Sequence, residues 1–432
     1  MNTKKIIFIA IGIFIVAIWC LKGCTDKEHS NNFSATRPVV VTYDSDQMEG
    51  VMLNMVMDHS KSMIGYLDIK GNEADNINFA STVGKLLSNF EYKFNSKCRI
   101  FCGKKEMDKR DFMDEMKDYN YITGNSSEIH EMIGNCIEEY VNDTSVCVIV
   151  SDLVMSFGPS VLQQKKDMYY NKNKLDNLSQ EIYNAVFKAK KNDFHIMIMQ
   201  YTSDFNGNYY YTYTENDINT DKYYKNKLMK NRPYYLMLIG KKEHLVAIYD
   251  NCAEVPERLY TSFDIEESSE SKAIALEVLD KNWQKGEDAK STPGEFYTEN
   301  NLNNKQTEVN ITYDNFVLPK YIQEKDLRIT VSADFKVKDT KYSNNKLSFT
   351  LVSPEFDNMK KKTTVAITVS YENLIDWEEI TISDDIKKEP DEIEGKTWEI
   401  EKIFERIDEV YFEEGRESEH IISKAEIMFV KE

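Results

Sequence analysis

Several hallmarks of familiar protein classes are missing from this sequence. Basic residues are in the minority, with 54 Lys and Arg against 73 Asp and Glu, so the net charge is −19. A nucleic-acid-binding surface needs a basic footprint to neutralise phosphates, and this balance argues against non-specific nucleic-acid binding. The six histidines show no ligand spacing, and no Gly-x-Ser-x-Gly, Walker or His-Glu-x-x-His motif occurs. These absences leave the common hydrolase, nucleotide-binding and zinc-peptidase classes without support.

Cysteine is also scarce, and its spacing does not match the usual zinc modules. Cys98 and Cys102 are four positions apart in an expected strand and have no His pair nearby, unlike the ligands of a zinc ribbon or finger. Most cysteines are expected to be small buried apolar residues. Export would permit a disulfide, whose pairing the sequence alone leaves open. The seven cysteines are Cys20, Cys24, Cys98, Cys102, Cys136, Cys147 and Cys252.

The longest apolar run lies at the N-terminus. Lys4 and Lys5 precede an uninterrupted apolar stretch at 6–21, and a basic flank of this kind favours a cytoplasmic N-terminus with the rest of the chain exported. Residues 21–24, Leu-Lys-Gly-Cys, resemble a bacterial lipobox, although Lys stands where a small residue is usual. We expect residues 1–24 to be a lipoprotein-type signal or an uncleaved transmembrane anchor. Either alternative places the protein on a membrane, facing out of the cytoplasm in the cell envelope.

The rest of the chain is long enough for two folded units, and its hydrophobic pattern changes along the way. Residues 25–47 are polar and are expected to form a tether. Over 48–252, buried apolar strands alternate with amphipathic helices, which predicts an α/β doubly wound, mostly parallel sheet. Charges dominate 253–305, the expected linker. Alternating strands and one helix over 306–432 predict a β-rich C-terminal domain, either an immunoglobulin-like sandwich or an α+β fold.

One dipeptide predicts a local modification of the first sheet. Asn206-Gly207 separates two strand-like stretches, and Asn-Gly is the strongest short hairpin signal. The tyrosine-rich stretch 208–214 is therefore expected to be an antiparallel extension that covers the edge and core of the sheet, with a recognition surface as the alternative.

Two aspartates, Asp58 and Asp152, stand at the ends of apolar strands. In a doubly wound sheet, ligands bind at the carboxyl ends of the strands, where these two carboxylates are expected. Residues 58–62 read Asp-x-Ser-x-Ser, which adds the hydroxyl groups of Ser60 and Ser62. Hard oxygen ligands of this kind suit Mg²⁺, which keeps several of its waters and needs few carboxylates.

The Asp-x-Ser-x-Ser stretch resembles the metal-ion-dependent adhesion site of the von Willebrand factor A family, and the order of elements over 48–252 is similar to that of its A domain. In that family a Thr and an Asp from two further loops complete the site, and one coordination position stays open for an acidic group of a partner. The resemblance implies Asp152 as the closing Asp. It implies Ser127 at the Thr position, with Thr123 and Ser126 as competing candidates. The implied ligands of Mg²⁺ or Mn²⁺ are Asp58, Ser60, Ser62, Ser127 and Asp152.

A second acidic pattern suggests a different chemistry. Residues 39–46 combine a β-branched run with Asp44 and Asp46, similar to the nucleophile and acid–base pair of haloacid-dehalogenase-like phosphatases. Gln47 and Met48 stand where that motif usually continues with Gly and Thr. A turn before the first sheet strand explains the pattern better.

The sequence therefore predicts a membrane-anchored, extracytoplasmic binding protein rather than an enzyme. Its A-like domain is expected to bind a protein partner that supplies an acidic group to a divalent metal. The C-terminal unit is then a spacer or a second interaction module. One alternative is a metal-independent scaffold of a cell-envelope complex, in which Asp58, Ser60 and Ser127 only cap their loops and helix. The other is a phosphatase-type enzyme that uses Asp44 and Asp46.

Overall fold

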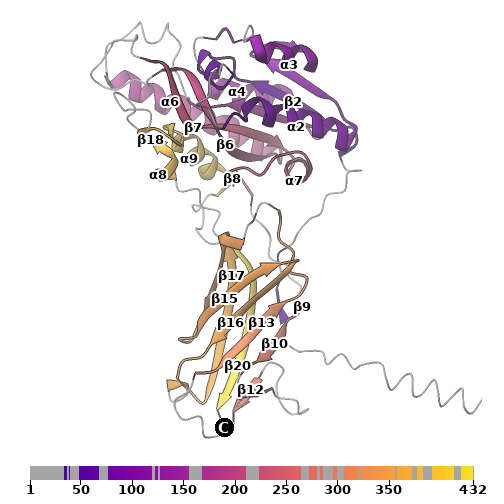
Figure 1. The fold of residues 1–432 in the computed structure, drawn as a ribbon, viewed down its shortest axis with the longest axis vertical. Coiled ribbons are helices and arrows are strands. Elements are labelled where there is room, and N and C mark those ends of the chain that lie inside the picture. The colour runs from indigo at the N-terminus through magenta and orange to yellow at the C-terminus, as the bar shows by residue number, and fades with distance from the viewer. Residues whose placement is uncertain are drawn as a thin grey trace, which may run out of the picture.

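Two separate hydrophobic cores divide the described part of the chain into an α/β unit and a β-sandwich, which lie end to end (Figure 1). Among the described residues, no helix is long and apolar enough to cross a membrane. The predicted anchor at 1–24 lies outside them. The computed structural model describes residues 34–36, 38, 48–67, 76–118, 122–124, 127–154, 168–210, 223–263, 272–279, 283–285, 295–298, 306–320, 322, 324–355, 358–371, 377–382, 392–412 and 420–431.

A mixed sheet forms the centre of the α/β unit. Within the described residues it has seven strands in the order β4-β3-β2-β5-β7-β6-β8. Strand β2 (Met52–Met57) lies parallel to β3 (Cys98–Cys102) and to β5 (Ser145–Ser151). The other neighbours are antiparallel. The remaining strands are β4 (Lys105–Met107), β6 (His195–Tyr210), β7 (Tyr223–Gly240) and β8 (Arg258–Thr261).

The predicted α/β character is confirmed, whereas the prediction of a mostly parallel sheet is wrong. Strands β6 and β7 pair antiparallel with each other, and β7 rather than β6 lies against β5. Parallel neighbours need a crossover connection of a dozen or more residues, usually a helix, whereas consecutive antiparallel strands need only a turn. The long β6–β7 pair therefore introduces an antiparallel strand into the middle of the sheet.

Amphipathic helices cover this sheet, as α2 (Phe79–Phe94) illustrates. Its buried residues Val83, Leu86 and Phe90 recur at helical spacing and face the core. Helix α2 lies beside α7, α4 lies beside α6, and α6 lies beside α9. The bounds are α3 (Lys109–Asp118), α4 (Ile129–Asn135), continued by the π-helical turn η3 (Cys136–Tyr140), α6 (Met168–Lys191), α7 (Lys242–Asn251) and α9 (Glu401–Tyr411).

The predicted hairpin turn at Asn206-Gly207 is wrong, because β6 runs through this dipeptide and stays paired with β7. Gly207 serves a close contact instead. A Cβ at this position would lie 2.6 Å from the Cα of Gly65, in the short 3-10 helix η2 (Lys61–Tyr66). The glycine therefore lets β6 approach the helix that follows the Asp-x-Ser-x-Ser loop.

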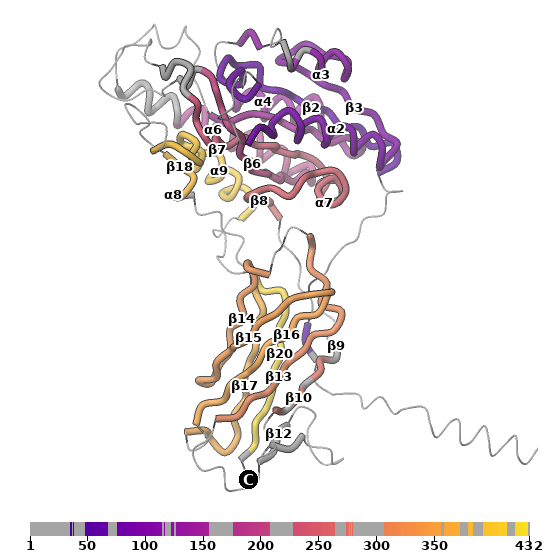
Figure 2. Tube along the Cα trace, viewed as in Figure 1, coloured from indigo at the N-terminus to yellow at the C-terminus, as the bar shows by residue number. Residues whose placement is uncertain are grey.

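A C-terminal segment returns to the α/β unit. Helix α9 packs against α6 (Figure 2). Its side chains Phe404 and Ile407 are fully buried in the first core. The Phe404 ring lies 5.1 Å from the Tyr260 ring, and the Tyr260 hydroxyl donates to Asp408 Oδ1 at 2.8 Å. The apolar stripe of α9 covers the first core rather than the second.

The predicted domain boundaries therefore do not follow the division of the cores. The predicted C-terminal domain contains α9, and the predicted linker 253–305 contributes β8 to the first sheet and strands β9 to β12 to the sandwich. Strand β1 (Ser34–Ala35), in the predicted tether, pairs with the sandwich strands β9 and β20. The segment 377–382, which holds α8 (Trp377–Ile380) and β18 (Thr381–Ile382), and β19 (Thr397–Trp398) also belong with the first core.

Two sheets enclose the second core, which confirms a β-rich C-terminal region. In the described residues the smaller sheet has the order β10-β13-β16-β15. The larger holds β11-β12-β20-β1-β9, with β17 beside β20 and β14 beside β17. The bounds are β9 (Lys272–Ala273), β10 (Ala275–Val278), β11 (Trp283–Lys285), β12 (Glu295–Thr298), β13 (Glu308–Tyr313), β14 (Leu327–Val331), β15 (Lys336–Ser343), β16 (Lys346–Val352), β17 (Lys362–Tyr371) and β20 (His420–Lys431).

Candidate metal centre

Strands β2 and β5 end side by side and bring Asp58 and Asp152 to the same edge of the sheet. The backbone N–H of Asp58 donates to the carbonyl of Val150 at 2.9 Å, so the ends of the two strands are in register. Both aspartates are only 1% exposed. Two buried carboxylates at the same edge of a sheet need hydrogen-bond donors or cations to compensate for their lost hydration.

The Asp-x-Ser-x-Ser loop is held by its own hydrogen bonds. The backbone N–H of Ser60 donates to Asp58 Oδ1 at 2.8 Å, and the hydroxyl oxygens of Ser60 and Ser62 lie 2.8 Å apart in a hydrogen bond. Ser60 has an extended backbone conformation and directly precedes η2. The loop thus gathers one carboxylate and two hydroxyl groups.

A second loop adds Ser127, which is buried and donates its hydroxyl to Asp58 Oδ2. Two backbone hydrogen bonds hold this loop against the first, from Gly124 N to His59 O at 2.9 Å and from Lys61 N to Gly124 O at 3.1 Å. Of the competing candidates, Thr123 is exposed, and Ser126 lies outside the described residues. Ser127 is therefore the candidate that the structure brings to Asp58.

Two glycines lie where the two loops meet, with little room for a side chain. A Cβ on Gly124 would lie 3.0 Å from both the ring and the backbone oxygen of His59, and a Cβ on Gly103 would lie 3.1 Å from the same ring. The His59 ring thus packs between two glycines and is half-buried. The loop that holds Gly124 therefore lies close against the loop that follows Asp58.

The third loop carries Asp152, whose carboxylate has two described donors. Asp152 Oδ1 accepts from the backbone N–H of Val154 at 3.2 Å, and Oδ2 accepts from Arg232 Nη2 at 2.9 Å. Arg232 comes from β7, is 5% exposed, and its guanidinium carbon lies 4.9 Å from the centre of the Phe205 ring. This is a buried ion pair whose planar cation stacks on an aromatic ring.

Arg232 and Ser151 also contact the two aspartates, and neither was predicted from the sequence. The Ser151 hydroxyl donates to Asp58 Oδ2 at 2.7 Å. Ser151 directly precedes Asp152 at the end of an apolar strand, so its hydroxyl could have been predicted to lie at this edge of the sheet. Arg232 is one of several basic residues before the apolar stretch of β7, and only the placement of β7 beside β5 relates it to Asp152.

Burial raises the pKa of Asp152 above its ordinary value. The Arg232 guanidinium opposes this rise in the pKa of Asp152, and the nearby charge of Asp58 adds to it. The two carboxylates therefore repel each other in a poorly solvated place. A positive charge at this edge of the sheet relieves that repulsion, and Arg232 supplies one.

The donor set fits a small divalent cation in composition. The Asp58 carboxylate accepts from the Ser127 hydroxyl and from the Ser60 backbone N–H, and the hydroxyl groups of Ser60 and Ser62 are hydrogen-bonded to each other. A carboxylate and three hydroxyl groups of this kind are hard oxygen ligands. Asp152, the fifth predicted ligand, is engaged by Arg232 instead. No cluster of three or more His, Cys, Asp or Glu able to hold a metal occurs among the described residues, and the predicted set has only two carboxylates.

No family model matches this chain, and no curated protein matches its sequence. The von Willebrand factor A-like identity and the metal stay predictions.

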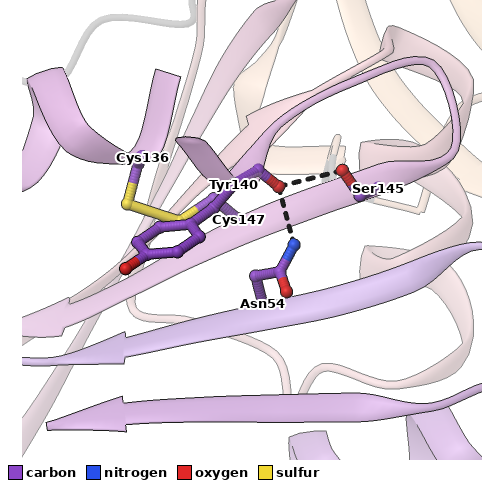
Figure 3. Close-up of a disulfide and its surroundings, with 5 residues drawn as sticks. All are labelled: Asn54, Cys136, Tyr140, Ser145 and Cys147. Atoms are coloured by element: carbon purple, nitrogen blue, oxygen red, sulfur yellow. Dashed lines mark hydrogen bonds between the residues drawn. A yellow bond between two sulfur atoms is a disulfide. The ribbon is translucent and has the colours of Figure 1, made fainter. Parts of the chain in front are cut away.

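A disulfide joins two elements of the site (Figure 3). It links Cys136, at the start of η3, to Cys147 in β5, with their Cα atoms 5.9 Å apart. Nearby, the carbonyl of Tyr140 accepts from Asn54 Nδ2 at 2.6 Å and from Ser145 Oγ at 2.9 Å. The helical segment that follows Ser127 is thereby fixed to β5, the strand that ends beside Asp152. Disulfides persist in oxidising compartments, which is compatible with the predicted export.

We expect loss of this disulfide to lower the free energy of unfolding by about 3 kcal/mol, because the bond closes a short loop in the unfolded chain. Urea denaturation of the double variant Cys136→Ala/Cys147→Ala against the oxidised protein measures this loss. The control Cys252→Ala, which removes a buried cysteine outside the disulfide, should keep the wild-type response to reductant. Equal midpoints for oxidised protein and double variant would contradict the prediction.

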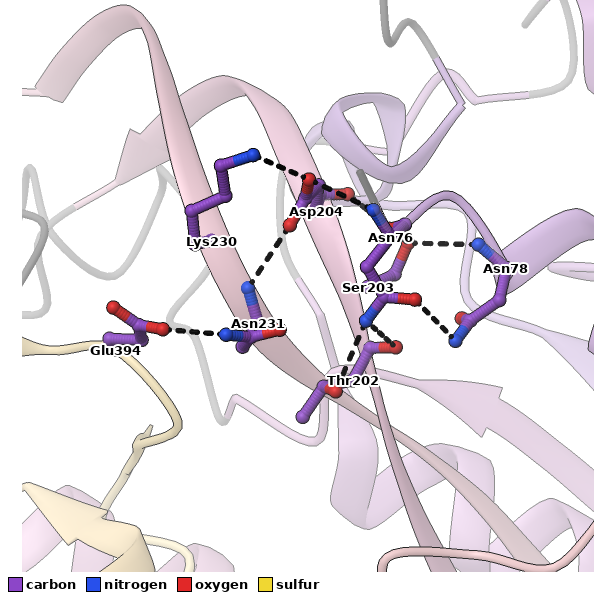
Figure 4. Close-up of polar contacts among 8 residues, drawn as sticks. All are labelled: Asn76, Asn78, Thr202, Ser203, Asp204, Lys230, Asn231 and Glu394. Atoms are coloured by element: carbon purple, nitrogen blue, oxygen red, sulfur yellow. Dashed lines mark hydrogen bonds and ion pairs between the residues drawn. The ribbon is translucent and has the colours of Figure 1, made fainter. Parts of the chain in front are cut away.

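A polar network fixes Lys230 and Asn231, the two residues just before Arg232 (Figure 4). The buried Asp204 carboxylate accepts from Asn76 N at 3.2 Å, from Lys230 Nζ at 3.1 Å and from Asn231 N at 3.3 Å. Asn231 has a positive φ of 49° and donates from its side chain to Glu394 at 2.7 Å. The network therefore holds the irregular backbone that immediately precedes Arg232.

Proposed function

We propose that this chain is a membrane-anchored, extracytoplasmic binding protein with a von Willebrand factor A-like domain. The domain would use a divalent metal, Mg²⁺ or Mn²⁺, to bind a protein partner. The observation that carries this proposal is the convergence of one buried carboxylate and three hydroxyl groups at the carboxyl ends of β2 and β5. The residues proposed to hold the ion are Asp58, Ser60, Ser62, Ser127 and Asp152.

The chain's own residues prepare this site for a cation. Asp58 supplies charge, and its carboxylate is oriented by donors from Ser60, Ser127 and Ser151. The hydroxyl oxygens of Ser60 and Ser62 already lie together, so little reorganisation is needed to direct both at one ion. A bound ion would supply an open coordination position for an acidic group of the partner.

The β-sandwich is suited to be a spacer near the membrane. Strand β1 pairs with β20 at Ala35 and Ala425, so the chain enters the sandwich at this point. Nine residues lie between position 24, the end of the proposed anchor, and Ser34. The chain from 24 to 34 spans at most about 35 Å. The sandwich, proposed as immunoglobulin-like, would thus stay close to the membrane and present the α/β unit beyond it.

A metal-independent scaffold is the second candidate function, and one observation favours it. Arg232 engages Asp152, and Asp58 accepts hydrogen bonds from several donors, so the site is partly compensated without any ion. Such a domain would bind its partner through its surface alone. The phosphatase alternative has no supporting observation, because Asp44 and Asp46 lie outside the described residues.

We expect calorimetric titration of the full chain in mild detergent with Mg²⁺ or Mn²⁺ to show one-site binding that Asp58→Ala abolishes. Alanine removes the charge and the oxygen ligands on which the cluster is built. The control Asp314→Ala removes an exposed carboxylate of the sandwich and should leave the titration unchanged. Absence of heat in the wild type, with thermal stability unchanged by EDTA, would favour the scaffold.

A further inference from the structure

The position of Arg232 follows from the inserted strand β7. The register pairs Ser151, the last residue of β5, with Tyr235 of β7. Because β7 runs antiparallel to β5, the residues that precede Tyr235 continue past the end of β5, where Asp152 follows. The strand that breaks the parallel order of the sheet is thus the element that delivers a cation to the site.

The contacts of Arg232 make it a fixed part of the site rather than a surface charge. Its side chain is 6% exposed, and that of its partner Asp152 is 1% exposed. Phe205 stacks on the guanidinium, and Tyr66, which follows the Asp-x-Ser-x-Ser loop, is a buried neighbour whose hydroxyl donates to the carbonyl of Pro233. The ion pair with Asp152 and the packing against Phe205 hold the guanidinium in place.

This cation changes the charge balance that a metal would meet. Asp58 and Asp152 place two buried carboxyl groups at this edge of the sheet, and the Arg232 guanidinium compensates the charge of Asp152. It also occupies Asp152 Oδ2, an oxygen otherwise free to face an ion. A divalent cation and a guanidinium repel each other strongly at short range in a poorly solvated site.

We propose that Arg232 is an internal counter-ion that competes with the metal for Asp152 and so keeps divalent-cation binding weak and readily reversible. This inference rests on the proposed metal site and assigns Arg232 a positioning role there. Without an ion, Arg232 neutralises Asp152 and keeps the loops in place. With an ion on Asp58 and the serine hydroxyls, the Arg232–Asp152 pair must loosen before Asp152 can contribute.

The test is calorimetric titration of the full chain with Mg²⁺ alone, comparing wild type, Arg232→Gln and Arg232→Lys. We expect Arg232→Gln to bind Mg²⁺ roughly tenfold more tightly or better, because it removes the repelling charge. Arg232→Lys should gain about threefold, since a flexible ammonium holds Asp152 less firmly than a planar fork. Thermal unfolding gives a second measurement, in which Mg²⁺ should raise the midpoint of Arg232→Gln more than that of wild type.

Arg99→Gln is the matched control. It removes an arginine of the same sheet that also pairs with a carboxylate and lies over a phenylalanine ring, but its partner is Glu106 and its side chain is 42% exposed. We expect its Mg²⁺ affinity to change by less than about twofold, because exposed charges are screened by solvent. A gain as large as that of Arg232→Gln would overturn the inference, since general charge and not the contact with Asp152 would then set the affinity.

The outcomes also separate this inference from the proposed function. Binding by wild type with equal or weaker binding by Arg232→Gln overturns the counter-ion role and leaves the metal site standing. Binding by Arg232→Gln but not by wild type supports the counter-ion role and contradicts the proposed function. Binding by neither protein overturns both. If Arg232→Gln does not yield folded protein, Arg232→Lys decides, and an unchanged affinity in that variant overturns the inference.

Discussion

Phe404→Ala is expected to lower the free energy of unfolding of the α/β unit by about 3 to 5 kcal/mol, although residue 404 lies near the C-terminal end of the chain. Phe404 is fully buried in the first core and contacts the Tyr260 ring of β8. Its truncation leaves a cavity between α9 and the sheet. Native-state hydrogen exchange measures the effect, because the amides of β2 and β5 should exchange faster in the variant.

Phe429→Ala provides the matched control for this result. Phe429 is also fully buried but lies in β20, in the core of the sandwich. Its loss should speed exchange in the neighbouring strand β17 and leave β2 and β5 as in the wild type. If Phe404→Ala left exchange in β2 and β5 unchanged, α9 would not be an integral part of the first core.

Asp152→Ala is expected to cost a similar amount, about 3 to 5 kcal/mol, in the absence of metal. The substitution removes the carboxylate that pairs with Arg232. The buried guanidinium is then left without its negatively charged partner. Removing one partner of a buried ion pair is strongly destabilising, because the remaining charge has already lost its hydration. Chemical denaturation in EDTA, with wild type and variant compared, measures the loss.

A double-mutant cycle with Arg232→Met distinguishes this cause from a general disturbance of the loop. The double variant Asp152→Ala/Arg232→Met removes both charges, so it should lose less stability than the two single variants added together. We expect a coupling of at least about 2 kcal/mol, within the range found for contacting residues. Additive losses would mean that the two side chains contribute independently and would contradict a tight buried pair.

Much of the site can be predicted from the sequence because its parts are local. A buried parallel strand is a continuous apolar run, so β2 and β5 can be read directly, and the polar residues that end them mark one edge of the sheet. The two serines lie within four residues of Asp58, and the hydroxyl loop directly precedes a helix. Each of these features depends on neighbours in the chain rather than on distant contacts.

Arg232 could not be predicted because its role depends on the order of the strands. That order is set by pairing between segments far apart in the chain, and the hydrophobic pattern of β7 is the same whether it lies beside β5 or at an edge. The misplaced hairpin at Asn206-Gly207 has a related cause. The dipeptide is a local turn signal, but the contact of Gly207 with Gly65 requires an extended strand there.

One turn of the sandwich and the packing of α9 against the first core could not be predicted from the sequence either. The alternation from residue 327 to 337 indicates one strand, whereas the structure places a turn between β14 and β15. Ala333 and Asp334 both adopt a φ of 61° in that turn, without the glycine that usually announces such a conformation. The apolar stripe of α9 predicts that one face of the helix is buried. It does not indicate which of the two cores that face packs against.

The central claim, that Asp58 and its neighbouring hydroxyl groups hold a divalent cation, is tested most directly by a crystal structure of the protein grown with Mn²⁺, using the anomalous signal of the metal. The account predicts one anomalous peak about 2 Å from the hydroxyl oxygens of Ser60 and Ser62. It also predicts a change in the 2.9 Å contact between Arg232 and Asp152. No peak at this position, with that contact unchanged, would contradict the metal site.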